Sequence, residues 1–244
     1  MKTLAYYPIL YGSEYLPYSM ESIRENVDHI IVLYSSTPTY GFSGQLPNPD
    51  SKEDIQKICD YFNAELIDIT DQKVSRENVH RELAFKYAYN NKYDIVVAVD
   101  YDEVWENLDE AIDYATNGSV FQYGIRGDQW VTLWKSFNEY VTDGFSPIRL
   151  FNLHKKKGTE ELIYKGKIYH FGYAISDDLM RYKLSTHGHK AEIENTWFKD
   201  KWIGYEKGVT KYLHPATDAY WIETNPFDKT ELPEFMKTHP KYNE

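Results

Sequence analysis

Apolar and polar positions in the first hundred residues follow a pattern that predicts strands separated by helices. Four short runs rich in β-branched and apolar residues have the length of strands: residues 3–10, 29–34, 65–69 and 95–99. Three stretches between them carry apolar residues at helical spacing: residues 15–26, 54–63 and 75–91. Strands joined by single helices form parallel sheets. The pattern therefore predicts an α/β fold with a doubly wound, mostly parallel sheet flanked by helices.

The second half of the chain is less regular and predicts a mixed continuation of this sheet. Helices are indicated over residues 108–116 and 177–187, and strands over residues 120–123 and 147–152. Residues 163–169 are expected to form a further strand, or a hairpin with Gly166 at its turn. From residue 213 the periodicity is lost and prolines recur. We therefore expect a single domain over residues 1–215, with halves 1–105 and 106–215, and an irregular, extended arm over residues 216–244.

The run at residues 95–99 ends in Asp100-Tyr101-Asp102-Glu103. Five consecutive apolar residues predict a strand buried on both faces, so the carboxylates follow at the edge where open α/β sheets bind ligands. Asp100 and Asp102 would point to the same side if the extended backbone continued. Two converging carboxylates suit Mg²⁺ or Mn²⁺, which also accept phosphate oxygens as ligands. The alternative is structural: one aspartate caps a following helix and the other is solvated.

Composition and charge narrow the classes of protein to which the chain can belong. The hydrophobic share is 42%, and the single cysteine, Cys59, excludes an intramolecular disulfide and fits a reducing compartment. The N-terminus does not resemble a signal peptide, and no apolar run reaches the roughly 20 residues of a membrane span. We therefore expect a soluble, cytoplasmic protein. The net charge of −11 argues against nonspecific nucleic-acid binding. Residues 145–215, with 13 basic and 8 acidic residues, nevertheless suit an anionic ligand such as a diphosphate or a nucleic-acid backbone.

The common phosphate-binding and catalytic motifs are missing from the chain. It contains neither a GxGxxG nor a GxxxxGK[ST] loop, so the dinucleotide-binding and P-loop classes lose their main support. The motifs CxxC, HExxH and GxSxG are also missing. A parallel sheet without a backbone phosphate cradle, but with Asp-x-Asp at the end of a strand, is expected to hold phosphate through a metal ion.

Four segments resemble the nucleotide-sugar half of family 2 glycosyltransferases with the GT-A fold: residues 13–23 (SEYLPYSMESI), 27–36 (VDHIIVLYSS), 80–88 (HRELAFKYA) and 100–103 (DYDE). The resemblance implies that residues 1–105 bind the nucleotide sugar and residues 106–215 the acceptor. It implies nucleotide-sugar contacts for Tyr7, Pro8, Glu14, Tyr34, Arg81, Asp100, Tyr101 and Lys183. The chain departs from the family at Tyr34, where an aspartate is usual, and at Tyr11-Gly12, so the resemblance leaves the nucleotide base open.

The segment Tyr169-His170-Phe171-Gly172-Tyr173 resembles an HxGY/W segment near the end of several such enzymes. The resemblance implies that His170 joins Asp102 and Asp100 around Mn²⁺ or Mg²⁺, because imidazole is an acceptable Mn²⁺ ligand. The roles of two further pairs of residues stay open. His187 and His189 are ligands, diphosphate donors or surface residues, and Lys183 and Arg181 are candidates for neutralising the departing diphosphate.

The expected activity is that of a metal-dependent glycosyltransferase, in which an acceptor hydroxyl attacks the anomeric carbon of a nucleotide sugar. We expect inversion of configuration, although nothing in the sequence decides against retention. An inverting enzyme needs a carboxylate as general base. Asp128 is the first candidate, and Asp177 and Asp178 are the alternatives, although their position before a helix favours capping. Trp130 and Trp134 are candidates for stacking on an acceptor ring.

Three other functions stay open from the sequence. One is sugar transfer to a modified nucleic-acid base, as in phage-type DNA modification; the aromatic residues interspersed in the basic segment are compatible with it, namely Trp197, Trp202, Tyr205 and Tyr212. A glycan or lipid acceptor is favoured over nucleic acid because the chain is acidic. The other two are a nucleotidyltransferase, which usually carries a glycine-rich basic motif that this chain lacks, and a non-catalytic nucleotide-sugar-binding domain.

Overall fold

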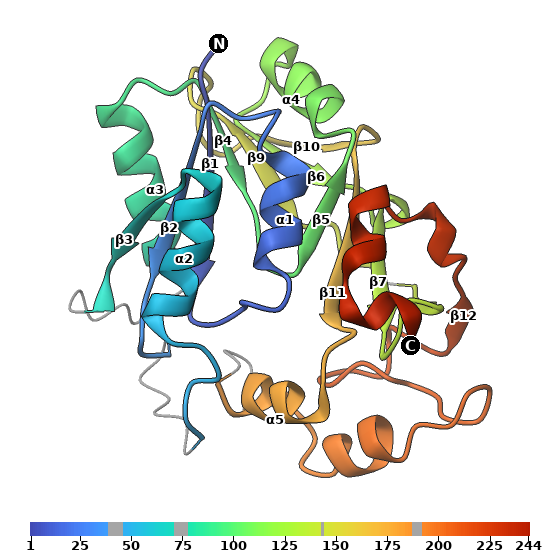
Figure 1. Ribbon diagram of the computed structural model, residues 1–244. Helices are drawn as coiled ribbons and strands as arrows, with labels where there is room; N and C mark the ends of the chain where they lie inside the picture. Colours follow the sequence, from blue (N-terminus) through green and yellow to red (C-terminus); the bar gives the residue numbers. More distant parts are fainter. Residues whose placement is uncertain (39–45, 71–77, 143, 187–191) are drawn as a thin grey trace.

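The computed structural model describes residues 1–38, 46–70, 78–142, 144–186 and 192–244. It contains two sheets, and helices flank the larger one on both faces (Figure 1). The larger sheet has seven strands in the order β10-β6-β9-β4-β1-β2-β3. Their bounds are β1 Thr3–Ile9, β2 His29–Tyr34, β3 Glu65–Asp68, β4 Ile95–Ala98, β6 Gln122–Ile125, β9 Ile148–Asn152 and β10 Glu160–Ile163. The prediction of an α/β fold built on a doubly wound, mixed sheet is confirmed.

The strands of the first half are parallel, as predicted: β1 pairs with β2 and β4, and β2 pairs with β3. The helices between them are α1 Leu16–Ile23, α2 Lys52–Phe62 and α3 Asn78–Asn90. α1 and α2 pack on one face of the sheet, where Met20 and Cys59 join the core around Val97. α3 packs on the other face, where Phe85 joins a second core around Val96. Strand β4 is therefore buried on both faces, as its apolar run predicts.

Local capping explains why helix ends differ from the predicted ones. α2 begins at Lys52, two residues early, because Ser51 and Asp54 form a capping box: the Ser51 Oγ accepts from Asp54 N at 3.1 Å, and the Asp54 carboxylate accepts from Ser51 N at 3.3 Å. α1 ends three residues early, at Ile23, and Asn26 N donates to Ile23 O across a tighter turn. The predicted start of the third helix, Ser75, lies outside the described residues.

A second, five-stranded sheet, in the order β12-β8-β7-β11-β5, was not predicted. Its strands are β5 Glu103–Glu106, β7 Trp130–Trp134, β8 Glu139–Val141, β11 Lys167–Tyr173 and β12 Thr224–Pro226. The strand or hairpin predicted over residues 163–169 is wrong. Gly166, with φ of 77°, separates β10 from β11, and the two strands enter different sheets. The remaining long helices are α4 Leu108–Asn117 and α5 Asp177–Thr186.

Strand β11 connects the second sheet to the end of β4. It runs antiparallel to β5, with His170 opposite Glu103, and parallel to β7, with His170 opposite Thr132. Between His170 and Tyr173 the register shifts by one residue, which is a β-bulge. Bulges are frequent beside active sites because they redirect side chains. The pairing therefore brings His170 next to the acidic motif, from which it is about seventy residues away in the sequence.

Residues 216–244 form an arm that packs on the molecule rather than a free tail. Strand β12 adds to the second sheet, and short helical turns follow at Lys229–Glu231, Glu234–Thr238 and Pro240–Asn243 (Figure 1). Trp221, Met236 and His239 of this arm are buried. The His239 ring stacks on Tyr15 of the α1 N-cap, with centroids 4.5 Å apart. Within the described residues, no helix is long and apolar enough to cross a membrane.

The buried His239 predicts a loss of stability in acid. Burial lowers the pKa of His239 to about 4, below its usual value of 6.5. The unfolded chain therefore binds more protons between these pH values, and the free energy of unfolding should fall as the pH drops from about 6.5 to about 4. His239→Phe keeps the stacking and removes the titration. We expect the free energy of unfolding of His239→Phe, measured in urea titrations, to fall less steeply with decreasing pH than that of the wild type, the two slopes differing by about 1.4 kcal/mol per pH unit. Equal slopes for the two proteins would contradict the assignment to His239.

Candidate active site

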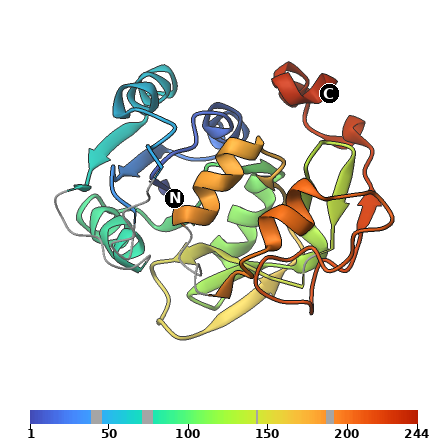
Figure 2. The same ribbon diagram turned by 90° about the horizontal axis from the view of Figure 1, so that it is seen from below.

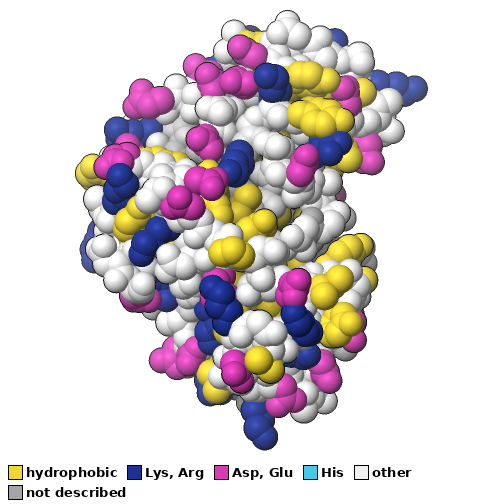
Figure 3. Space-filling model, turned by 90° about the vertical axis from the view of Figure 1, so that its right-hand side faces the viewer, with side chains coloured by type: hydrophobic (Ala, Val, Ile, Leu, Met, Phe, Trp, Pro, Cys, Tyr) yellow, Lys and Arg dark blue, Asp and Glu magenta, His cyan; other side chains and the backbone are white. Residues whose placement is uncertain are grey.

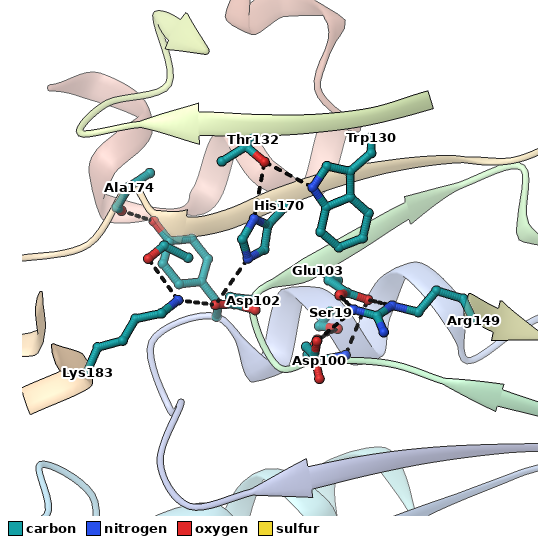
Figure 4. A network of polar contacts seen from close by, with 12 residues as sticks. Ser19, Asp100, Asp102, Glu103, Trp130, Thr132, Arg149, His170, Ala174 and Lys183 are labelled. Carbon is teal, nitrogen blue, oxygen red and sulfur yellow. Dashed lines mark hydrogen bonds and ion pairs between the residues drawn. The ribbon is translucent and has the colours of Figure 1, made fainter. Parts of the chain in front are cut away.

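The chain turns sharply where β4 ends, and this turn separates the two aspartates of the acidic motif. Glu103 N donates to Asp100 O at 3.1 Å, and β5 begins at once. The extended backbone that would place both carboxylates on one side does not continue through Asp102. Asp100 binds Arg149, whereas Asp102 faces Lys183 (Figure 4). The helix-capping alternative is wrong as well, because the motif leads into a strand rather than a helix.

Asp102 lies in a compact polar cluster with two side chains from the second half of the chain. Its Oδ2 is 3.4 Å from Lys183 Nζ and 3.8 Å from His170 Nε2 (Figure 4). Only 4% of the Asp102 side chain is exposed. His170 Nδ1 lies 3.3 Å from the Thr132 hydroxyl, which accepts a hydrogen bond from Trp130 Nε1 at 3.0 Å. Thr132 and Trp130 thus fix the orientation of the imidazole.

The protonation state of His170 suits metal binding. Burial lowers the pKa of His170 to about 4, more than the neighbouring Asp102 raises it. The imidazole is therefore neutral near pH 7, and the neutral ring is the form that binds metal ions.

Gly172 allows the three polar groups of this cluster to meet. A Cβ atom at position 172 would lie 2.5 Å from Lys183 Nζ and 2.6 Å from both Asp102 Oδ2 and His170 Nε2. Any side chain at this position would force the groups apart. Glycine in the HxGY segment is therefore required for steric reasons that the sequence does not reveal.

Replacing Gly172 with Ala should disrupt the cluster but not the fold. The methyl group would meet the ends of three side chains, which can move, so we expect a loss of stability of about 1–2 kcal/mol. If Asp102 and His170 bind Mn²⁺ with a nucleotide, that binding should weaken by roughly tenfold or more. Calorimetric titration with Mn²⁺ and nucleoside diphosphate measures the binding. Shortening Lys183 in Gly172→Ala/Lys183→Ala should relieve part of the stability loss; unchanged binding in the single variant would contradict the steric role.

Beside this cluster, Arg149 of β9 joins Asp100 to Glu103. Its Nη2 lies 2.7 Å from the Asp100 carboxylate and also contacts Glu103, and its Nε donates to Glu103 at 3.1 Å. Burial raises the pKa of Glu103 well above its usual range, more than Arg149 lowers it. Desolvation is the largest single effect on Asp100 and raises its pKa, but Arg149, the hydrogen bond with Glu103 and the positive charge of Lys183 act together against it, so the pKa of Asp100 is lowered. The guanidinium packs on the Trp130 ring at 5.3 Å, which links this group to the His170 cluster.

A cavity of about 340 Å³ opens at the same edge of the sheet. It lies at the carboxyl ends of β1, β2 and β4, on the face covered by α3, and Thr186 of α5 closes one side. The lining includes the polar and charged residues Tyr6, Ser35, His80, Arg81, Asp100 and Arg149. Seen from below, α5 lies across the middle of the molecule (Figure 2). Since α5 also carries Lys183, one helix contributes to the cavity and to the Asp102 cluster.

The structure places the eight predicted nucleotide-sugar contacts in different surroundings. Pro8, Arg81 and Asp100 line the cavity, and Lys183 faces Asp102. Tyr7 lies on the opposite face of β1, fully buried, with its hydroxyl 3.0 Å from Ser19 Oγ. Tyr34 and Tyr101 are also buried and do not line this cavity. Glu14 lines a different cavity.

Tyr6, His80 and Arg149 are among the cavity residues that the sequence prediction missed. Arg149 leaves a signal, because a charged residue inside the apolar strand 147–152 needs a partner. Tyr6 could have been predicted from the alternation of side chains along a strand. If Pro8 lines the cavity, Tyr6 lies on the same face of β1 and Tyr7 on the opposite face.

The residues predicted to bind the acceptor and to act as base are dispersed. Trp134 is fully buried among other tryptophans and offers no face to an acceptor, and Trp130 is buried between His170 and Arg149. Asp128 is exposed and paired with Arg126 at 2.9 Å. Asp178 lines a second cavity, of about 460 Å³, together with Glu14, Asp50 and Arg181. Asp177 accepts a hydrogen bond from Trp202 Nε1.

Two of the three predicted metal ligands, Asp102 and His170, lie close enough to share one ion. Within the described parts of the chain, no three His, Cys, Asp or Glu side chains form a group able to hold a metal by themselves. The predicted trio is thus not assembled, because Asp100 is held by Arg149. Asp102 and His170 are 3.8 Å apart, and two ligands of one Mg²⁺ or Mn²⁺ ion lie roughly 3 to 4 Å apart. His187 and His189 lie outside the described residues.

No protein-family model and no curated protein matches this sequence. Among solved structures, the chain is similar to glucosyl-3-phosphoglycerate synthase from Mycobacterium tuberculosis in complex with phosphoglyceric acid, with a TM-score of 0.32 and 16% identity over 51% of this chain and 43% of that one. A mycobacterial protein gives a TM-score of 0.35 and 16% identity over 54% of this chain and 41% of that one. A197 from STIV gives a TM-score of 0.37 and 13% identity over 70% of this chain and 86% of that one. This chain thus spans less than half of the first two proteins. Similarities this distant do not assign a function.

Proposed function

We propose that this protein is a glycosyltransferase that transfers a sugar from a nucleotide-sugar donor to an acceptor hydroxyl with the help of Mn²⁺ or Mg²⁺. One observation carries the proposal: the polar cavity at the carboxyl edge of the sheet and the Asp102–His170–Lys183 cluster are joined by the Asp100–Asp102 turn and lie under the same helix, α5. A nucleoside pocket beside a diphosphate site is what a nucleotide sugar requires.

In this proposal the cavity binds the nucleoside, with Asp100 toward the ribose and Arg81 available as a donor. Asp102 and His170 would hold the metal ion, which would supply positive charge for stabilising the departing diphosphate. Thr132 keeps the imidazole in place, and Lys183 adds a positive charge beside the leaving group. These groups are preorganised by the fold, so little reorganisation is needed during the reaction.

The acceptor side supports a narrower proposal. Of the predicted bases, Asp178 lines a cavity, and Asp128 points to Arg126 at the surface. We therefore place the acceptor hydroxyl near Asp178, at the start of α5, and keep an inverting reaction on a glycan or lipid as the expected chemistry.

A nucleic-acid acceptor finds less support. Trp197 and Trp202, which the sequence offers as stacking platforms, are buried. On the face shown in Figure 3, Lys and Arg side chains lie among Asp and Glu side chains rather than in one basic field. The electrostatic attraction that nucleic-acid binding needs is therefore weak on this face.

The proposal is tested by thermal shift with UDP-, GDP-, CMP- and dTDP-sugars, each with and without Mn²⁺, followed by an assay of donor hydrolysis. We expect one donor class to raise the melting temperature, more so with Mn²⁺, and to be hydrolysed slowly. Binding without hydrolysis or transfer would favour a non-catalytic binding domain, and release of pyrophosphate from a nucleoside triphosphate would favour a nucleotidyltransferase. If no donor stabilises the protein, the proposal is wrong.

A further inference from the structure

Lys183 contacts the carboxylate of Asp102, one of the two residues proposed to bind the metal ion. Its ammonium group is 3.4 Å from Asp102 Oδ2, donates to Gly172 O at 3.0 Å, and lies 4.9 Å from the centroid of the Tyr173 ring. Only 15% of the Lys183 side chain is exposed. Three groups thus hold the ammonium in place. One of them, Asp102, is the only carboxylate that faces His170 among the described residues.

The charges in this cluster balance without a metal ion. Asp102 contributes one negative charge and Lys183 one positive charge, whereas a ligating imidazole contributes none. A divalent ion bound to Asp102 and His170 would leave three positive charges facing one negative charge in a largely buried place. Such an excess is unfavourable in a poorly hydrated site. The missing negative charges are those of a diphosphate.

We propose that Lys183 makes binding of the divalent cation conditional on the diphosphate of the donor. Without donor, the ammonium neutralises Asp102 and opposes the cation. With donor, the ammonium pairs with a diphosphate oxygen, and Asp102 becomes available to the cation. The inference rests on the proposed function and specifies the order of events at that site. Because coupling is reciprocal, the cation must raise the affinity for diphosphate by the same factor by which diphosphate raises the affinity for the cation.

The test measures Mn²⁺ binding from the EPR signal of the free ion, with pyrophosphate and UDP as probes and Mg²⁺ omitted. The wild-type protein should bind Mn²⁺ weakly alone and at least tenfold more tightly with either probe, after correction for Mn²⁺ bound by the probe itself. Lys183→Met should bind Mn²⁺ alone about tenfold more tightly than the wild type, and its coupling factor should be smaller. Equal or weaker Mn²⁺ binding by Lys183→Met alone would overturn the inference.

Lys167→Met is the matched control. Lys167 also lies over an aromatic ring, that of Tyr169 at 4.6 Å, and beside a carboxylate, that of Glu231 at 3.5 Å, but away from Asp102. It should behave as the wild type. Adding Asp102→Asn to Lys183→Met should remove the gained Mn²⁺ affinity, which ties the gain to this carboxylate. Melting temperatures of all variants show whether they are folded.

The outcomes separate the two proposals. If the wild type binds Mn²⁺ together with UDP but Lys183→Met binds Mn²⁺ alone no better, the coupling role of Lys183 is wrong and the glycosyltransferase proposal stands. If nucleotide binds equally well with and without Mn²⁺, the conditional binding is wrong and Lys183 itself neutralises the diphosphate. If neither nucleotide nor Mn²⁺ binds any folded variant, both proposals fall.

Discussion

Replacing Asp102 with Asn should reduce metal-dependent donor turnover by about 10³-fold or more, the largest catalytic effect expected for any residue of this chain. Asp102 is the carboxylate that faces both His170 and Lys183, so the amide would remove the negative charge that attracts a cation while keeping the shape of the side chain. The effect is measured as the rate of donor hydrolysis at saturating Mn²⁺, with the nucleotide sugar that the thermal-shift experiment identifies as the donor.

The fold of Asp102→Asn should survive, because the residue follows the sheet rather than filling its core. Nucleotide binding without metal should persist through the separate cavity. Asp60→Asn, an exposed carboxylate on α2, is the matched control and should keep full turnover. Wild-type turnover by a folded Asp102→Asn protein would remove the main support for the proposed chemistry.

Replacing Arg149 with Met should cause the largest loss of stability, about 3 kcal/mol at pH 7. Arg149 is largely buried, and its guanidinium binds Asp100 and the fully buried Glu103. Methionine fills much of the space but satisfies neither carboxylate. Urea denaturation measures the free energy of unfolding. Arg81→Met, an arginine of the same cavity without a carboxylate partner among the described residues, should lose less than about 1 kcal/mol.

The pH dependence of this variant identifies the residue responsible. The pKa of Glu103 is already raised by burial, and without Arg149 it should rise further. For an acid with a raised pKa, the stability contribution is present below the unfolded value and is lost as pH rises toward the folded value. The deficit of Arg149→Met should therefore grow between about pH 5 and pH 8. Adding Glu103→Gln should flatten that increase; an unchanged slope would assign the deficit to lost packing on Trp130.

The parallel strands of the first half are predictable from sequence because each of them is a local signal, whereas β10 of the same sheet is not predicted. Buried parallel strands are continuous apolar runs, and the helices between them have a three- to four-residue period, so neither depends on a distant partner. The second sheet is different. Its β8 and β12 strands have three residues each, and β11 changes its neighbours along its length, so only pairing with distant segments defines them.

Aromatic residues show the same limit. Trp134 and Trp202 are compatible with a stacking surface when only the sequence is considered, but they fill the core under the second sheet. A single sequence does not distinguish the two uses, because the flat apolar face that stacks on a sugar or a base also packs in a core.

The α/β architecture of the first half and the location of the acidic motif at the carboxyl edge of the sheet can be predicted from sequence alone, since both follow from local periodicity. The sequence also points to His170, through a short motif. The three-dimensional structure is needed to show which carboxylate faces His170 and Lys183, why position 172 is glycine, and that Arg149 holds Asp100. These are contacts between segments separated by many residues, and their geometry depends on a turn after β4 and a bulge in β11. Neither changes the hydrophobic pattern, so neither can be deduced from it.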